Sequence, residues 1–396
     1  MKMRAGIIFL LLLTVSKGFS LYFDWSLRDS LNYIYFAPST NTNSTSAMLI
    51  NNAGLYFNLY LDDKKYLSFG LSDYYMYSGT NGTNQIFIDK LFVNYTGDNI
   101  QFILGRNYFK KMSGLVIAGK GDGLNFKAVL FGTEIDLLVL YYGLLPNLIN
   151  SFEFNPEDQI QGAQRYTGGI TISRYDLIGE KLSLGFFYCF DTTTNNTRYQ
   201  PFFIELYNMG SFSADAGYRF SAIYQGGQNE GATISAFGTM FDFLLKITSV
   251  PKAGMIFSVG YSTGGSGRTN TYPIGNTTSQ DTLFYSPGYV DTGIVLFPKF
   301  SNLFLLKLSG FIGFGNVFTI NVNALMLNKA VADCPISDTG ANLTNSYVGT
   351  ELSILMKAHL DYSMDLILSA GVFLKGEAYS DQSLMMKIYS GVNIKI

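Results

Sequence analysis

Apolar and polar residues alternate one by one along most of this chain. In the first such segment, Phe23, Trp25 and Leu27 alternate with Asp24 and Ser26. Successive side chains of a β-strand point to opposite faces, so the pattern predicts strands with one apolar and one polar face. The alternation recurs up to the C-terminus, and no other feature of the sequence restricts the possible folds so strongly.

The composition argues against an ordinary soluble sheet protein. The 396 residues are 47% hydrophobic, 16% aromatic and only 14% charged, whereas a soluble chain usually carries about 25% charge. Beyond residue 20, no apolar run approaches the roughly 18 residues of a membrane-spanning helix. Strands that face lipid must close into a barrel, because an open edge would leave backbone groups unpaired. We therefore predict an all-β fold, a transmembrane antiparallel β-barrel.

The N-terminus has the organisation of a secretory signal peptide. Lys2 and Arg4 precede an apolar run over 5–15, and the small residues Gly18 and Ser20 predict cleavage after Ser20. The run is about half the length that an anchor helix needs. We expect residues 1–20 to be removed and 21–396 to form a single barrel domain in the bacterial outer membrane. The net charge is −2 even before this basic segment is lost, which argues against a nucleic-acid partner.

The spacing of turn sequences predicts 18 strands. Barrels of this class alternate short periplasmic turns with longer external loops. Eight short turns are expected near residues 62–64, 97–98, 132–133, 178–179, 209–210, 250–252, 315–316 and 360–361. Nine longer connections are expected near 38–46, 78–84, 107–120, 145–164, 191–197, 225–230, 264–301, 330–344 and 377–382. Residues 288–297 could form one more strand, but this would make the number odd, so we assign them to an external loop or a constriction. A 16-stranded barrel is the alternative.

Charged residues in phase with the polar face are candidates for lining the lumen, where they would set the field that a permeating solute meets. The pore-lining candidates are Arg28, Arg106, Lys127, Arg165, Glu205, Asp215, Arg219, Lys307, Glu351 and Lys387. They could form opposed charged ladders that orient solutes, or ion pairs that stabilise the wall. Arg106 is followed by Lys110, Lys111 and Lys120, in a loop that could fold inward or stay outside.

The sequence offers no set of residues for catalysis or for metal binding. A hydrolase would need an imidazole to activate a nucleophile or water, and the one histidine, His359, lies beside a predicted turn. Cys189 and Cys334 are far apart and lack the spacing of metal ligands. We expect no enzyme activity and no catalytic, metal-binding or cofactor-binding residue. The cysteines could form a disulfide or remain thiols.

The segment 86–124 resembles the alginate-export family of outer-membrane porins. It contains Phe-Ile-Leu-Gly-Arg-Asn at 102–107, then a loop, and an Asp-Gly pair at 122–123 that opens the next strand. The resemblance implies an 18-stranded monomeric barrel, although Asn107 replaces the usual Gln and the negative net charge departs from the family's cationic pores. It points to Gly105, Arg106, Asp122, Gly123 and Glu351.

These observations predict a porin for the passive passage of small hydrophilic solutes, anions among them. A dedicated exporter of polysaccharides or organic anions is one alternative, and a surface adhesin is another. The expected partners are outer-membrane lipid, the permeating solutes or anionic saccharides, and the barrel-assembly machinery. A monomer is favoured, with a trimer as the alternative.

Overall fold

The computed structural model describes residues 22–37, 46–78, 81–143, 164–192, 199–247, 252–267, 280–338, 340–342, 344–360 and 364–395. The predicted signal peptide, residues 1–20, lies outside them. The described residues form β1 (Tyr22–Ala37), β2 (Ser46–Tyr60), β3 (Lys65–Ser78), β4 (Asn81–Thr96), β5 (Ile100–Lys110), β6 (Ala118–Leu130), β7 (Thr133–Tyr141), β8 (Arg165–Tyr175), β9 (Lys181–Asp191), β10 (Tyr199–Ser211), β11 (Ala216–Asn229), β12 (Ala232–Ile247), β13 (Ala253–Ser262), β14 (Gln280–Asp281), β15 (Leu303–Phe314), β16 (Phe318–Lys329), β17 (Tyr347–His359), β18 (Met364–Lys375) and β19 (Leu384–Lys395).

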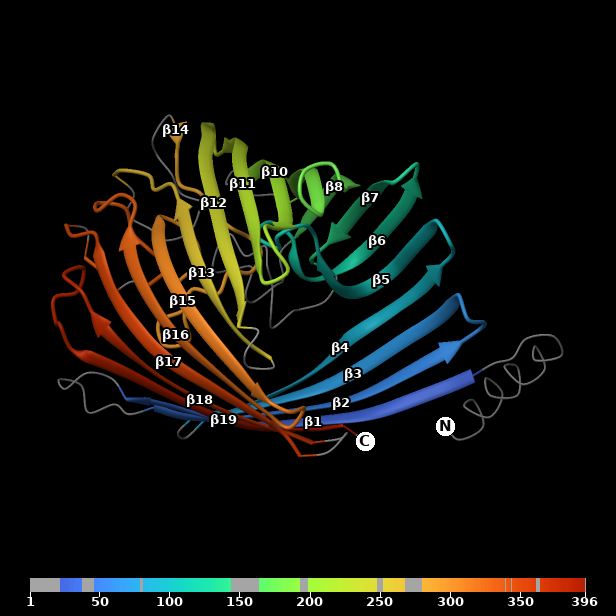
Figure 1. Ribbon diagram of the computed structural model, residues 1–396, viewed down its shortest axis with the longest axis horizontal. Helices are drawn as coiled ribbons and strands as arrows, with labels where there is room; N and C mark the ends of the chain where they lie inside the picture. Colours follow the sequence, from blue (N-terminus) through green and yellow to red (C-terminus); the bar gives the residue numbers. More distant parts are fainter. Residues whose placement is uncertain are drawn as a thin grey trace.

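The wall is a closed antiparallel barrel of 18 strands, as predicted, and the 16-stranded alternative is wrong. Each strand pairs with the next in the chain, and β1 pairs with β19 to close the sheet (Figure 1). The two-residue β14 is not a wall strand, because it pairs only at the end of β12 while β13 pairs directly with β15. Closure leaves no free sheet edge running the full height of the barrel. No helix among the described residues is long and apolar enough to cross a membrane.

One predicted turn and one predicted pore-lining residue are displaced. The turn expected at 209–210 lies at 212–215, because both expected turn residues continue the ladder between β10 and β11. Asp215 is therefore a residue of this turn and not of the barrel wall, which corrects its assignment to the lumen. A Met-Gly pair resembles a turn in sequence, but at this point it is still within a paired strand.

Two of the predicted long connections are tight. The residues of the expected loop at 225–230 are mostly strand, and β11 connects to β12 through Glu230 and Gly231 alone. Their φ angles of 52° and 104° are both positive, which is typical of the turns that join two-residue hairpins. The loop expected at 78–84 is also short, since β3 ends at Ser78 and β4 begins at Asn81.

The outward face of the wall is apolar. Trp25 on β1, Val139 on β7 and Leu184 on β9 each expose more than half of their surface, and their neighbours at alternate positions point inward. A predominantly apolar exterior around a closed sheet is stable only in lipid. The structure is therefore that of a membrane-spanning barrel. We call the end that carries the short turns the turn end, and the other the loop end.

The lumen contains its own hydrophobic core towards the loop end. Inward side chains of the wall, such as Phe187 on β9 and Phe203 on β10, pack with residues 115–117 and with Phe284 and Phe300, all nearly inaccessible to solvent. Residues 115–117, Phe284 and Phe300 belong to connections between wall strands. These connections therefore fold into the barrel, and residues 288–297 form a constriction and not a nineteenth wall strand.

Candidate functional site: the constriction of the lumen

Two inward segments meet inside the barrel. We call residues 111–117 the β5–β6 segment and residues 282–302 the β14–β15 segment. Gly288 N donates to Leu115 O at 3.0 Å, and Tyr289 N donates to Gly114 O at 2.9 Å. A Cβ at Gly288 would lie 1.9 Å from Gly114 O, so only glycine allows this approach. The two segments together bridge the lumen.

The β5–β6 segment is attached to the wall through buried charges. The carboxylate of Glu205 on β10 accepts hydrogen bonds from Ser113 N, at 3.2 Å, and from the Ser113 hydroxyl. Lys111 Nζ lies 2.6 Å from an oxygen of Asp136 on β7. Burial lowers the pKa of Lys111, and the nearby Asp136 carboxylate opposes this effect. The alternative that this loop stays outside the barrel is therefore wrong.

The β14–β15 segment is attached to another part of the wall, on β15 and β17. Glu351 on β17 accepts hydrogen bonds from Ile294 N at 2.7 Å and from Val295 N at 2.9 Å, one on each carboxylate oxygen. Lys307 on β15 forms an ion pair with Asp291 of the segment. These contacts hold the segment across the lumen instead of along the wall.

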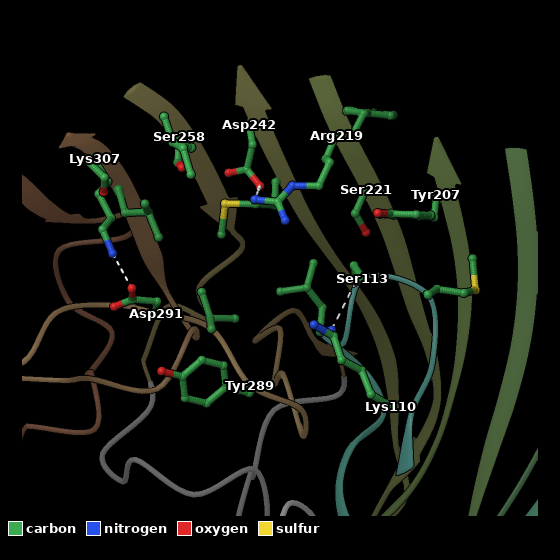
Figure 2. Close-up of a pocket in the computed structure, with 18 residues that line it drawn as sticks. Lys110, Ser113, Tyr207, Arg219, Ser221, Asp242, Ser258, Tyr289, Asp291 and Lys307 are labelled. Atoms are coloured by element: carbon green, nitrogen blue, oxygen red, sulfur yellow. Dashed lines mark hydrogen bonds and ion pairs between the residues drawn. The ribbon is translucent and has the colours of Figure 1, made fainter. Parts of the chain in front are cut away.

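A cavity of about 280 Å³ lies between the two segments and wall strands β10 to β15 (Figure 2). Five charged side chains line it: Lys110, Arg219, Asp242, Asp291 and Lys307. Each carboxylate is paired, since Arg219 Nη2 lies 3.0 Å from Asp242 and Lys307 contacts Asp291. Lys110 forms no ion pair within the part of the chain that the structure describes, so positive charge is in excess here.

A second cavity, of about 520 Å³, lies on the other side of the β14–β15 segment. Lys387 contributes its cationic end, and Asn323, Ser353, Ser369 and Tyr389 contribute polar groups. Tyr289, Asp291 and Lys307 line both cavities and therefore mark their boundary. A solute that crosses the barrel here would meet a cation on either side of the segment.

Of the ten predicted pore-lining residues, the structure gathers four around these cavities: Arg219, Lys307, Glu351 and Lys387. Two others lie elsewhere in the lumen. The Arg28 guanidinium is 4.8 Å from the centre of the Tyr56 ring, which Lys90 Nζ also approaches to 5.0 Å, and Lys127 lies 3.2 Å from Glu134. The period of two thus identified these side chains as inward. It could not predict which of them the inward segments would approach.

Three further candidates are inward but covered. Arg165 is fully buried 3.3 Å from Asp191, Glu205 is fully buried under Ser113, and Arg106 exposes only 2% of its side chain. Arg106 binds both oxygens of Asp122 and donates to Ile88 O at 3.3 Å. For Arg106 and Arg165, together with Lys127 and Arg219, the ion-pair alternative describes the observed contacts, whereas Glu205 accepts hydrogen bonds from Ser113 and Ser221. None of the three covered side chains is positioned to contact a solute in this conformation.

Sequence reasoning missed two charged residues of the first cavity. Asp242 lies on β12 in phase with inward-facing Ala236 and Met240, so strand periodicity could have identified it. Asp291 lies in a segment without any period, and no sequence signal marks it. Lys90 was also missed, because a bulge in the pairing of β3 with β4 changes the phase beside Asp89.

The remaining reactive side chains form no further site. His359 Nδ1 lies 2.5 Å from an oxygen of Asp365, which also pairs with Lys357 at 3.0 Å. No group of three or more His, Cys, Asp and Glu side chains that could hold a metal gathers among the described residues. Cys189 and Cys334 are both buried and are not joined in a disulfide.

The fold and the constriction define a class, the transmembrane β-barrel whose lumen is narrowed by its own loops. No family model and no curated protein matches the sequence. Among solved structures, the chain is similar to the outer membrane protein OprD from Pseudomonas aeruginosa (10% identity, TM-score 0.60, covering 96% of this chain and 95% of that one). It is also similar to Acinetobacter baumannii OccAB4 (10% identity, TM-score 0.61, 94% and 98%) and to P. aeruginosa OccK2 (OpdF) in complex with glucuronate (9% identity, TM-score 0.60, 94% and 96%). At such identities the likeness is one of fold. The resemblance to the alginate-export family receives no support from these comparisons.

Proposed function

We propose that the protein is a porin of the bacterial outer membrane, through which small hydrophilic solutes diffuse passively with a preference for anions. The observation that carries this proposal is the excess of cationic side chains around the first cavity, where Lys110 adds to Arg219 and Lys307. Inward charges at a narrow point set the field for every ion that passes. We infer no enzyme activity.

The orientation in the membrane follows from the two ends of the barrel. Short turns face the periplasm in barrels of this class, so the turn end, where β1 begins and β19 ends, is assigned to the periplasm. The apolar exterior is the contact with outer-membrane lipid, and export by a signal peptide and insertion by the barrel-assembly machinery follow from this location. A monomer accounts for the closed wall without a second subunit.

Small organic anions are the favoured solutes. OccK2, which shares the fold, was solved in complex with glucuronate. The second cavity of this chain offers Lys307 and Lys387 for a similar carboxylate, beside the acidic Asp291 and Glu351. An exported polysaccharide, which the alginate-export resemblance would imply, is less favoured. An extended polymer could pass only if the hydrogen bonds between the two inward segments were broken.

The test is single-channel recording of the refolded barrel in a planar bilayer under a KCl gradient, comparing Lys307→Gln with Lys64→Gln. Lys64 is an exposed lysine of the β2–β3 turn with an ion pair to Asp98, so it controls for charge removal outside the lumen. A unit charge about 4 Å from an ion in water is worth about 1 kcal/mol, or about fivefold in a ratio. We expect Lys307→Gln to reduce the anion-to-cation permeability ratio by about two- to fivefold and Lys64→Gln to leave it unchanged.

Glucuronate added on one side should block the current of the wild-type channel and block Lys307→Gln less strongly. A folded barrel without conductance would overturn the porin function and would favour the adhesin alternative. Conductance with cation preference would preserve the channel but reject anions as its favoured solutes.

A further inference from the structure

The two inward segments are anchored at distant points of the wall. Glu205 lies on β10 and Glu351 on β17. Five wall strands, β11, β12, β13, β15 and β16, lie between them, so the anchors are six interstrand spacings apart. At about 4.8 Å per strand, the two anchor points are separated by about 29 Å along the wall. Each carboxylate nevertheless binds a segment that extends into the middle of the lumen.

Both anchors are buried carboxylates that accept backbone N–H groups. Glu205 is fully buried and Glu351 is 1% exposed, so water competes with neither set of hydrogen bonds. Hydrogen bonds to a charged acceptor are stronger than neutral ones, so replacing the carboxylate by the neutral amide of Gln weakens the attachment. By contrast, the ion pair between Lys307 and Asp291 is half exposed on the Asp291 side and is therefore weak.

The segments are also bound to one another. Besides the two backbone hydrogen bonds from Gly288 and Tyr289, the Ser286 hydroxyl donates to Leu115 O at 2.5 Å. Leu115 packs in the same core as Phe284 and Tyr285. Three hydrogen bonds and a shared apolar core make it costly to displace one segment while the other stays in place.

We propose that the β5–β6 and β14–β15 segments move as a single gate, for which Glu205 and Glu351 are the two positioning residues. Loss of either carboxylate loosens both segments, and displacement of the pair joins the two cavities into one wider passage. This proposal rests on the proposed channel function for its electrical readout, and a chemical readout is therefore included.

The first test is the open-state occupancy of single channels formed by Glu205→Gln, Glu351→Gln and the double variant. Loss of a charge-assisted hydrogen bond should raise the occupancy of the higher conductance level about tenfold in each single variant. In a single two-state gate the free-energy contributions of the two anchors add, so the double variant should raise the open-to-closed ratio by about the product of the two single effects. Glu134→Gln is the matched control, since Glu134 is a buried inward carboxylate whose ion-pair partners, Lys127 and Lys181, lie on wall strands β6 and β9.

The second test measures the coupling without current. Val295→Cys reports on the β14–β15 segment and Leu115→Cys on the β5–β6 segment, both from buried positions. Glu205→Gln should raise the rate of maleimide labelling at Val295→Cys about tenfold, and Glu351→Gln should do the same at Leu115→Cys. Labelling of Cys189 and Cys334 in the wild-type barrel provides the background, and heat-modifiable migration confirms folding.

A double-variant effect no larger than the sum of the two single effects, or labelling that rises only in the segment whose own anchor is removed, would overturn the single gate. Unchanged occupancy and labelling in folded Glu205→Gln and Glu351→Gln barrels would overturn the role of both anchors. A wild-type barrel without current that still shows the cross-labelling would reject the channel function and retain the coupled segments.

Discussion

Arg165 shows how a side chain can face the lumen without lining a pore. It follows the inward phase of β8, but its guanidinium and the Asp191 carboxylate are both fully buried, 3.3 Å apart. Strand periodicity predicts which face of the sheet a side chain points to. It cannot predict whether a segment from elsewhere in the chain covers that side chain. For the same reason, the sequence identified Glu205 and Glu351 as inward but not as hydrogen-bond acceptors for two loops.

Arg165→Met should lower the free energy of unfolding by about 3–5 kcal/mol, because it leaves the Asp191 carboxylate buried without its cation. Urea unfolding of the refolded barrel, followed by tryptophan fluorescence or by heat-modifiable migration, measures this. Arg174→Met, at an exposed arginine near the turn end of β8, is the control and should change stability little. If the double variant Arg165→Met/Asp191→Leu is no more stable than Arg165→Met, the buried charge is not the cause.

At the scale of elements, the alternation of apolar and polar residues predicted the strands well only where the outward side chains contact lipid and must be apolar. Nearly all wall strands lie where the alternation placed them, whereas β11 extends through a Gly-rich stretch that resembles a loop. Towards the loop end, hydrogen bonds to β10 and β12 hold β11 as a strand, and its outward residues there need not be apolar. The path of the inward segments could not be predicted from the sequence either, because it depends on contacts between distant parts of the chain.

Strand β5 contains a position that only glycine fits. Gly105 has a φ of 121°, and a Cβ there would lie 2.2 Å from Leu91 O of β4. Beyond this point β5 pairs with β4 only as far as Arg106 and then continues with β6 into the lumen. Gly105→Ala should therefore destabilise the barrel by about 1–3 kcal/mol in urea unfolding. Gly310→Ala on β15, where a Cβ meets no atom within 4 Å, is the control, and an equal loss there would contradict this explanation.

Strands β1 to β3 carry an exception to the apolar exterior. Asp29 follows the outward phase between Leu27 and Leu31, and Asn51 donates to it at 3.0 Å. Asp73 follows the outward phase between Leu71 and Tyr75, and its Oδ1 is buried without a hydrogen bond to any described residue. An outward acid within the lipid-facing band costs free energy, less than the 2–4 kcal/mol of a base. Asp73→Leu should therefore raise the stability of the barrel in lipid vesicles by about 1–2 kcal/mol. A loss of stability would mean that this carboxylate has a favourable contact in the membrane.

At the scale of the whole molecule, the net charge of the chain and the charge of the side chains that line the first cavity have different signs. The chain is acidic overall, with a net charge of −2, yet cations are in excess around the first cavity. The second cavity is balanced, with Lys307 and Lys387 against Asp291 and Glu351. Composition and strand periodicity could not predict this separation, because it depends on which charges the inward segments leave uncovered. Selectivity should therefore come from the local field of a few lysines and arginines and not from the charge of the protein.

A field of this kind is screened by salt, and this predicts how selectivity depends on ionic strength. The Debye length is about 10 Å at 0.1 M salt and about 3 Å at 1 M, so at low salt Lys110, Arg219, Lys307 and Lys387 act together on a passing ion. The anion-to-cation permeability ratio, measured from reversal potentials at a fixed twofold KCl gradient, should fall towards one between about 0.1 M and 1 M. In Lys307→Gln the ratio should depend less on salt, because one source of the field has been removed. A wild-type ratio that stays constant over this range would show that anions are selected by direct contact at a binding site, since only contacts shorter than the Debye length escape screening.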